Sequence, residues 1–234
     1  MKNHELQKDD YKLFYEETLY SRRYVHTKRV NAFLDIFRDS IRNNYIQLYK
    51  GNVYYRAQNG CLENEKRKKE PYKKERMFPL KRQAREGRIN PKGIPYLYLT
   101  ESIDNALFEI GSNYKSYVSI GRFVLKRNIQ VVCFYNLLLN FWPELIISDK
   151  SSPSVTVWNE INQAFAKPIK NTDQTAEYVP TQVFAEIIKD EGFDGILYMN
   201  AYYECYNLCL FNVDDASLRG INLKYIRSKY YEHD

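Results

Sequence analysis

Histidine, a residue suited to acid–base catalysis and metal binding, is scarce in this chain. Its 234 residues include three histidines, and His4 and His233 lie close to the ends, where chains are commonly disordered. A histidine-based catalytic triad or a histidine-ligated metal is therefore disfavoured. Any catalysis must depend on carboxylates, arginines, tyrosines or amides, and we expect no metal site.

The cysteines predict free thiols. Cys61, Cys133, Cys205 and Cys209 form no Cys-x-x-Cys pair, so neither a zinc site nor a disulfide is indicated. Residues 1–10 are polar and lack the apolar stretch of a signal peptide, and no apolar run has the length of a membrane span. We expect a cytoplasmic protein with no membrane partner.

Charge and glycine content bear on the partner. A formal net charge of +6 favours an anionic partner such as a nucleotide phosphate, nucleic acid or an acidic protein, although plain solubility explains it equally well. There is no G-x-G-x-x-G and no Walker sequence, which disfavours a Rossmann or P-loop nucleotide enzyme. The 22 tyrosines suit partly solvated pockets, because each has an apolar ring and a hydroxyl group that forms hydrogen bonds.

The first part of the chain predicts helices and then a strand. Residues 9–48 carry apolar side chains at helical spacing, which indicates two amphipathic helices broken near 21–27. A short strand follows at 53–57. The long polar stretch at 58–87 contains lysine runs that could touch phosphates, but we favour a solvated loop.

The rest of the chain alternates between strands and helices. We expect, in order, a turn at 87–93, a strand at 94–100, a helix at 102–110, a strand-rich run at 121–135, a mixed region at 141–175, a helix at 181–192 and closing strands at 196–198 and 207–211. Ser102 or Thr100 can cap the first of these helices and Thr181 the second. Short strands mixed with helices favour an α+β fold, which we divide into an N-terminal helical extension, 1–50, and a domain, 51–234.

Several short motifs together resemble the RES domain, a family named for an Arg, a Glu and a Ser. They are YRA at 55–57, GRINPKG at 87–93 running into YLYLT at 96–100, ALFE at 106–109, YVPTQ at 178–182, GFDGI at 192–196 and NLCLF at 207–211. Each is weak alone, but their shared order and spacing make a fairly specific match over about two thirds of the chain.

The resemblance implies a compact fold like that of ADP-ribosyltransferases and NAD as substrate, with no further cofactor. Family members act as toxins that deplete NAD by hydrolysis or phosphorolysis, and a helix-turn-helix antitoxin encoded beside them silences them. We therefore expect an enzyme that cleaves the nicotinamide–ribose bond of NAD and acts as a toxin or defence effector.

The resemblance also implies the site residues. Glu109, Arg56 and Tyr98 fall on catalytic positions, and Arg56, Arg88, Tyr98 and Asn200 on NAD-binding ones. Paired arginines suit a pyrophosphate, a carboxylate stabilises the positive charge that builds up on the ribose, and a tyrosine can stack on nicotinamide or hydrogen-bond to it. Asn200 stands where the family has Ser; it can donate a hydrogen bond but cannot act as a small hydroxyl donor.

Two other functions stay open. The same fold permits transfer of ADP-ribose to a protein or nucleic acid, although nucleic acid is disfavoured as a partner. The departure at Asn200 also suits a degenerate domain that only binds nucleotide. Residues 1–50 have three candidate roles: packing on the domain, homodimerisation or binding a regulator.

Overall fold

The computed structural model describes residues 5–42, 44–80, 83–111, 115–134, 152–166, 176–199 and 205–227. The helices are α1 (Asp10–Tyr20), α2 (Lys28–Arg42), α3 (Ile103–Glu109), α6 (Pro153–Ala166) and α7 (Val179–Asp190), with short 3-10 helices η1 (Lys74–Met77) and η3 (Val213–Asp215). The strands are β1 (Tyr45–Leu48), β2 (Val53–Asn59), β3 (Leu62–Glu63), β4 (Lys69–Glu70), β5 (Leu97–Thr100), β6 (Ser116–Leu125), β7 (Ile129–Cys133), β8 (Gly195–Met199), β9 (Tyr206–Leu210) and β10 (Ala216–Ile226).

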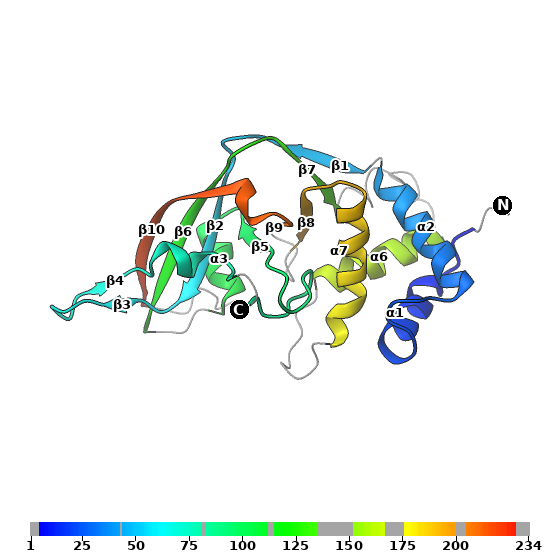
Figure 1. Cartoon of the computed structure of the whole chain (residues 1–234), viewed down its shortest axis with the longest axis horizontal. Helices are drawn as coiled ribbons and strands as arrows, with labels where there is room; N and C mark the ends of the chain where they lie inside the picture. The colour runs from blue at the N-terminus through cyan, green and yellow to red at the C-terminus, as the bar shows by residue number, and fades with distance from the viewer. Residues whose placement is uncertain are drawn as a thin grey trace, which may run out of the picture.

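Eight strands form one mixed sheet in the order β1-β7-β8-β9-β5-β2-β6-β10, while β3 and β4 form a separate hairpin. Within the described residues β7 and β8 run parallel and the other neighbours run antiparallel. Figure 1 places α1, α2, α6 and α7 at one end of the molecule and the hairpin at the other. This confirms the α+β fold, because helices gather on one part of a largely antiparallel sheet.

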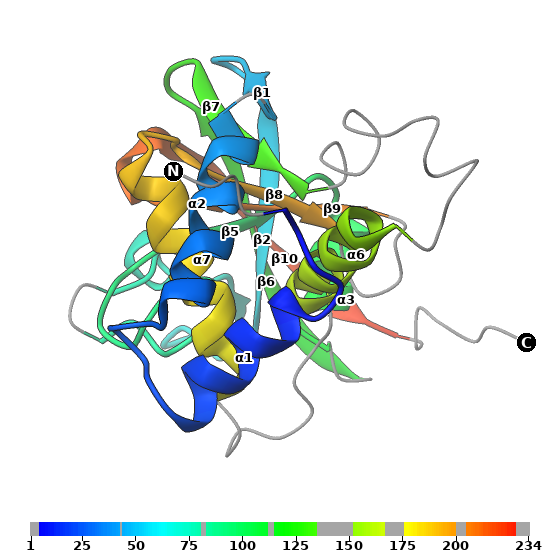
Figure 2. The ribbon, with the colours of Figure 1, turned by 90° about the vertical axis from the view of Figure 1, so that its right-hand side faces the viewer.

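The main core lies between the helices and the sheet, and its centre is aromatic. Phe184 of α7 is fully buried, with its ring centroid 4.8 Å from that of Phe14 in α1 and 4.4 Å from that of Phe37 in α2. Figure 2 shows these helices in front of the sheet. Buried aromatic rings contribute large apolar areas, so this contact stabilises the docking of the N-terminal helices.

The N-terminal segment is not helical throughout, contrary to the prediction for 9–48. α2 ends at Arg42, and Tyr45–Leu48 pairs with β7 as an edge strand of the main sheet. Its side chains alternate between exposed and half-buried, as a strand with one covered face requires. The described residues 5–42 and 44–50 thus share a core and a sheet with the rest of the chain, while the division of 1–50 from 51–234 as a separate unit stays a prediction.

Three further elements differ from the sequence prediction, and one of them is β10, which follows the last strand expected at 207–211. The polar stretch at 58–87 contains the β3–β4 hairpin, whose tip is closed by the Asn64 side chain accepting hydrogen bonds from the backbone N–H of Lys66 and Lys68. Helix α6 lies in the region predicted as mixed. The helix at 102–110 is confirmed as α3, and Ser102 caps it by accepting from Asn105 N over 3.1 Å.

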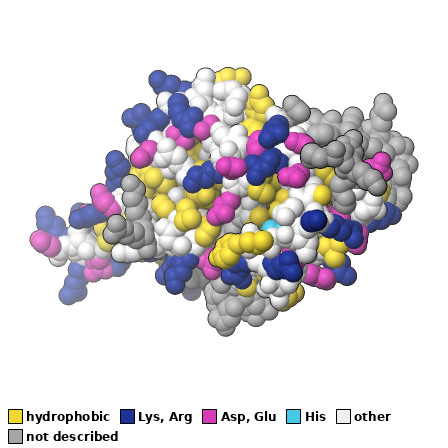
Figure 3. Space-filling view, turned by 45° about the vertical axis from the view of Figure 1, so that its right-hand side comes forward, with side chains coloured by type: hydrophobic (Ala, Val, Ile, Leu, Met, Phe, Trp, Pro, Cys, Tyr) yellow, Lys and Arg dark blue, Asp and Glu magenta, His cyan; other side chains and the backbone are white. Residues whose placement is uncertain are grey.

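Charge is spread over the surface. On the face in Figure 3, basic and acidic side chains alternate, so the positive charge forms no single patch there. In the described part of the chain, no helix combines the length and apolar character that crossing a membrane requires.

Candidate functional site

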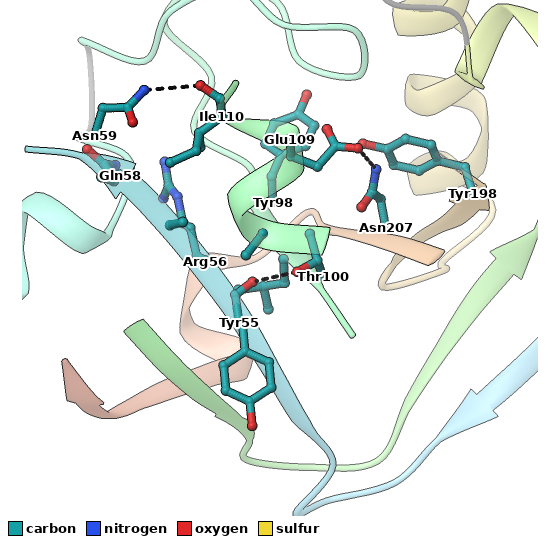
Figure 4. Close-up of a pocket in the computed structure, with 13 residues that line it drawn as sticks. Tyr55, Arg56, Gln58, Asn59, Tyr98, Thr100, Glu109, Ile110, Tyr198 and Asn207 are labelled. Atoms are coloured by element: carbon teal, nitrogen blue, oxygen red, sulfur yellow. Dashed lines mark hydrogen bonds between the residues drawn. The ribbon is translucent and has the colours of Figure 1, made fainter. Parts of the chain in front are cut away.

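A cavity of about 460 Å³ opens where β2 and β5 separate. These strands pair only through Tyr55 and Thr100 in the described structure, and beyond that point Arg56 and Tyr98 both line the cavity. The last residue of α3, Glu109, reaches the same cavity, as Figure 4 shows. Three residues predicted for the site, Arg56, Tyr98 and Glu109, therefore come together although they lie far apart in sequence.

Glu109 is held by a short chain of amides. Asn207, buried at the start of β9, donates from Nδ2 to Glu109 Oε1 over 2.7 Å. The side-chain oxygen of Asn207, Oδ1, accepts a hydrogen bond from Asn105 Nδ2 over 3.1 Å. This contact sets the orientation of the Asn207 amide, so that its NH2 group points to the carboxylate. Glu109 is itself exposed, because it ends α3 at the rim of the cavity.

Arg56 supplies the positive charge of the cavity. One guanidinium N–H donates to the carbonyl oxygen of Met77 over 3.0 Å, and Arg56 forms no ion pair with any carboxylate of the described residues. Burial, together with the charge of Arg76, lowers the pKa of Arg56 to about 10, which leaves it protonated at neutral pH. A half-buried guanidinium without a carboxylate partner favours binding an anion.

Tyr98 contributes its ring to the cavity and its hydroxyl to the protein. The hydroxyl accepts from Ile89 N over 3.1 Å and donates to Asn90 Oδ1 over 2.8 Å. Burial raises the pKa of Tyr98 well above its ordinary value, so it stays a neutral phenol. Its hydrogen bonds thus anchor the turn at 87–93 beside the cavity, and the face of the ring is what a ligand can contact.

Arg88 is not brought to the cavity wall. Its Nη1 donates to the carbonyl oxygen of Phe165 at the end of α6, and its guanidinium carbon lies 5.8 Å from the centre of the Tyr198 ring, which does line the cavity. The last carbonyls of a helix lack partners within it and carry negative partial charge, which explains why an arginine is placed there. Arg88 thus does not line the first cavity, and joint binding of one pyrophosphate by Arg56 and Arg88 stays a prediction.

The turn that carries Arg88 is fixed from α7. Thr181 was expected to cap this helix, but its hydroxyl donates to the carbonyl oxygens of Arg88 and Tyr178 from inside the helix. Asn200, the remaining residue predicted for the site, lies outside the described residues.

A second cavity of about 430 Å³ adjoins the first. Both are lined by Arg56, Gln58 and Tyr98, so these side chains form the wall between them. Each volume falls in the range of small-molecule sites. The two cavities differ in charge: Glu109 and Arg56 line the first, whereas Glu86 and the three arginines Arg56, Arg76 and Arg85 line the second.

Sequence reasoning missed Asn207 and Tyr198 as functional side chains. Both lie in strands that are otherwise apolar, where a polar group is costly to bury without a partner. A polar residue at the start of NLCLF was the signal for Asn207. In the described ranges, no cluster of His, Cys, Asp and Glu could hold a metal ion.

Comparison with known proteins gives one family. The model of the RES domain matches residues 66–227, a range that includes Arg88, Tyr98 and Glu109 but begins after Arg56. No curated protein matches. A crystal structure of the M. tuberculosis MbcT–MbcA toxin–antitoxin complex contains a similar chain, with 10% identity and a TM-score of 0.43 over 80% of this chain and 91% of that chain. This likeness is too low to support an inference.

Proposed function

The chain belongs to the RES-domain family, and from that premise we propose that it binds NAD and cleaves the bond between nicotinamide and ribose. The observation that carries the proposal is that one cavity is lined by a carboxylate, Glu109, and by a guanidinium, Arg56, that pairs with no carboxylate in the described part of the chain. NAD presents the complementary pattern, with a pyrophosphate next to a ribose that bears a cationic leaving group.

The proposed reaction breaks the bond between ribose C1′ and the nicotinamide nitrogen. The bonding electrons leave with nicotinamide, which becomes neutral, while the ribose gains positive charge. Glu109 at the rim of the cavity stabilises that charge, because a fixed carboxylate interacts more strongly with the transition state than with the ground state. Water or phosphate then adds to C1′ and loses a proton.

The other residues position the substrate. Arg56 would bind the pyrophosphate through the N–H groups that Met77 leaves available. Tyr98 and Tyr198 offer ring faces in the same cavity, suited to the planar nicotinamide. Asn207 acts through Glu109, whose carboxylate it orients by the 2.7 Å hydrogen bond.

The experiment is incubation of the purified protein with NAD labelled in the adenosine half. Release of nicotinamide tests cleavage, and the fate of the label identifies the acceptor. Free ADP-ribose indicates hydrolysis, its phosphate ester indicates phosphorolysis, and label on a macromolecule indicates ADP-ribosyl transfer. NAD that binds but stays intact would identify a domain that only binds nucleotide and would overturn the proposal.

The biological role is part of the same proposal. We propose that the protein acts in the cytoplasm as an NAD-depleting toxin, with a helix-turn-helix antitoxin as its partner. Expression of the chain alone should lower cellular NAD and arrest growth, and co-expression of a small helix-turn-helix protein encoded beside it should restore both. Homodimerisation through residues 1–50 is a further prediction, which the mass of the purified protein in solution tests.

A further inference from the structure

The second cavity has more positively charged side chains than are needed to bind one pyrophosphate. Among the described residues, it is lined by the three arginines Arg56, Arg76 and Arg85 and by one acidic residue, Glu86. Neither Arg76 nor Arg85 forms an ion pair with a carboxylate of the described residues, and both side chains are exposed. Three positive charges around a small hollow, with little internal neutralisation, favour a ligand with several negative charges.

Glu86 offsets only one of these three positive charges. Its Oε1 lies 3.3 Å from Gln182 Nε2, which also donates to the carbonyl oxygens of Gly87 and Asn90. The Glu86 carboxylate is thereby part of the network that joins the 87–93 turn to α7. The influence of Arg76 on Arg56 agrees with a net positive cavity, because its charge adds to burial in lowering the pKa of Arg56.

The position of Glu109 sets the direction of a bound dinucleotide. The bond that breaks must lie near this carboxylate, so the nicotinamide half belongs in the first cavity. Arg56 in the shared wall then takes the pyrophosphate, and the adenosine half extends into the second cavity. Phe78 and Tyr96 line that cavity and offer aromatic surface to a base.

We propose that the second cavity binds a phosphomonoester on the nucleoside remote from the scissile bond, so that the phosphorylated dinucleotide NADP is preferred over NAD. This inference depends on the proposed function for the direction of the ligand. Since Arg56 is assigned to the pyrophosphate, Arg76 and Arg85 are available to bind the phosphomonoester, which carries two negative charges. A guanidinium matches a phosphate through two parallel N–H groups, so each can contribute a bidentate contact.

The binding test needs no turnover. Calorimetry compares adenosine 2′,5′-bisphosphate with adenosine 5′-monophosphate on the wild type, on the double variant Arg76→Gln/Arg85→Gln and on Lys74→Gln, an exposed residue of η1 that lines neither cavity. The wild type and Lys74→Gln should bind the bisphosphate at least about 10-fold more tightly, the equivalent of one charge-assisted hydrogen bond. The double variant should bind the two ligands equally.

Two results would overturn the inference. One is equal affinity of the wild type for the two nucleotides. Equal affinity would overturn the inference even if inorganic phosphate alone binds tightly. The other is a preference for the bisphosphate that survives in the double variant. The double variant also tests folding, because its thermal midpoint should match that of the wild type when both altered residues are exposed.

The turnover test separates this inference from the proposed function. The ratio of kcat/KM for NADP to that for NAD should exceed about 10 in the wild type and fall toward 1 in the double variant. Equal release of nicotinamide from both substrates would keep the proposed function and reject the phosphate site. A preference for the bisphosphate in a protein that cleaves neither dinucleotide would do the reverse.

Discussion

Asn207 Nδ2 donates to Glu109 Oε1 over 2.7 Å although the two residues are 98 positions apart, so a buried strand orients the carboxylate at the end of α3. Asn207 is itself fixed by Asn105 in the same helix. The relationship makes the position of Glu109 depend on the packing of α3 against β9, and not on the helix end alone.

Replacing Asn207 by Asp tests this relationship. The change places a second carboxylate within hydrogen-bond distance of Glu109, and two like charges so close raise the pKa of one of them. The acid limb of the pH–rate profile should therefore move to higher pH and kcat should fall by about 10-fold or more. Asn212→Asp, on an exposed residue of the following loop, is the matched control. A profile identical to that of the wild type would show that the two groups do not interact.

Arg56→Lys tests anion binding. Lysine keeps the positive charge but loses the planar fork, so KM for the dinucleotide should rise by about 10-fold with a smaller change in kcat. Steady-state kinetics measure this, with Arg122→Lys on the exposed side of β6 as the control. An unchanged KM in Arg56→Lys would remove Arg56 from the binding site.

Glu191 gives the stability a pH dependence. Hydrogen bonds from Arg42 and Arg38, each 2.6 Å at its shortest, join α2 to the end of α7 and lower the pKa of Glu191 below its ordinary value of 4.5. A carboxyl group with a lowered folded-state pKa stabilises the protein above its unfolded-state pKa, and this contribution is lost as pH falls through the folded-state value.

Glu191→Gln should therefore lower the free energy of unfolding by about 0.5–1 kcal/mol at neutral pH. The difference from the wild type should shrink as pH falls from 4.5 through the lower folded-state pKa of Glu191, below which both side chains are uncharged. Urea unfolding at several pH values measures it. A difference that is constant with pH would mean that the ion pairs contribute nothing.

Phe184→Ala tests whether residues 1–50 fold with the rest of the chain. The phenyl ring contacts Phe14 and Phe37, so its removal should lower the free energy of unfolding by about 3–5 kcal/mol. Glu186→Ala, an exposed position of the same helix, is the control. In a Trp142→Phe background, fluorescence of Trp158, which stacks on Phe37, should report the same single transition as far-UV circular dichroism. Two separate transitions would show that the N-terminal helices form an independent unit.

Local patterns predicted the elements whose signals are local. Ser102 predicted the start of α3, and the periodic spacing of apolar residues predicted α1 and α2. Helix α6 could also have been predicted from within the region interpreted as mixed, since Val157, Trp158, Ile161 and Phe165 recur at helical spacing. The strand β1 could not be recognised in this way, because four residues become a strand only when the edge of β7 is available to pair with them.

The identity of the site residues could be predicted, because it follows from residue types in the motifs. The placement of their side chains could not, because it depends on tertiary contacts. Arg56, Tyr98 and Glu109 were grouped by the family motifs, and the structure brings them to one cavity. The position of Arg88 depends on where α6 ends, and the orientation of Glu109 on a strand 98 residues away, so neither could be read from local sequence.

Release of nicotinamide from NAD by the wild type, Glu109→Gln and Asp104→Asn is the most direct measurement of the account. Both changes remove one exposed carboxylate from α3, but only Glu109 lines the cavity. The wild type and Asp104→Asn should release nicotinamide at similar rates, and Glu109→Gln should be slower by about 100-fold or more with an unchanged thermal midpoint. Full turnover by a folded Glu109→Gln variant would contradict the account.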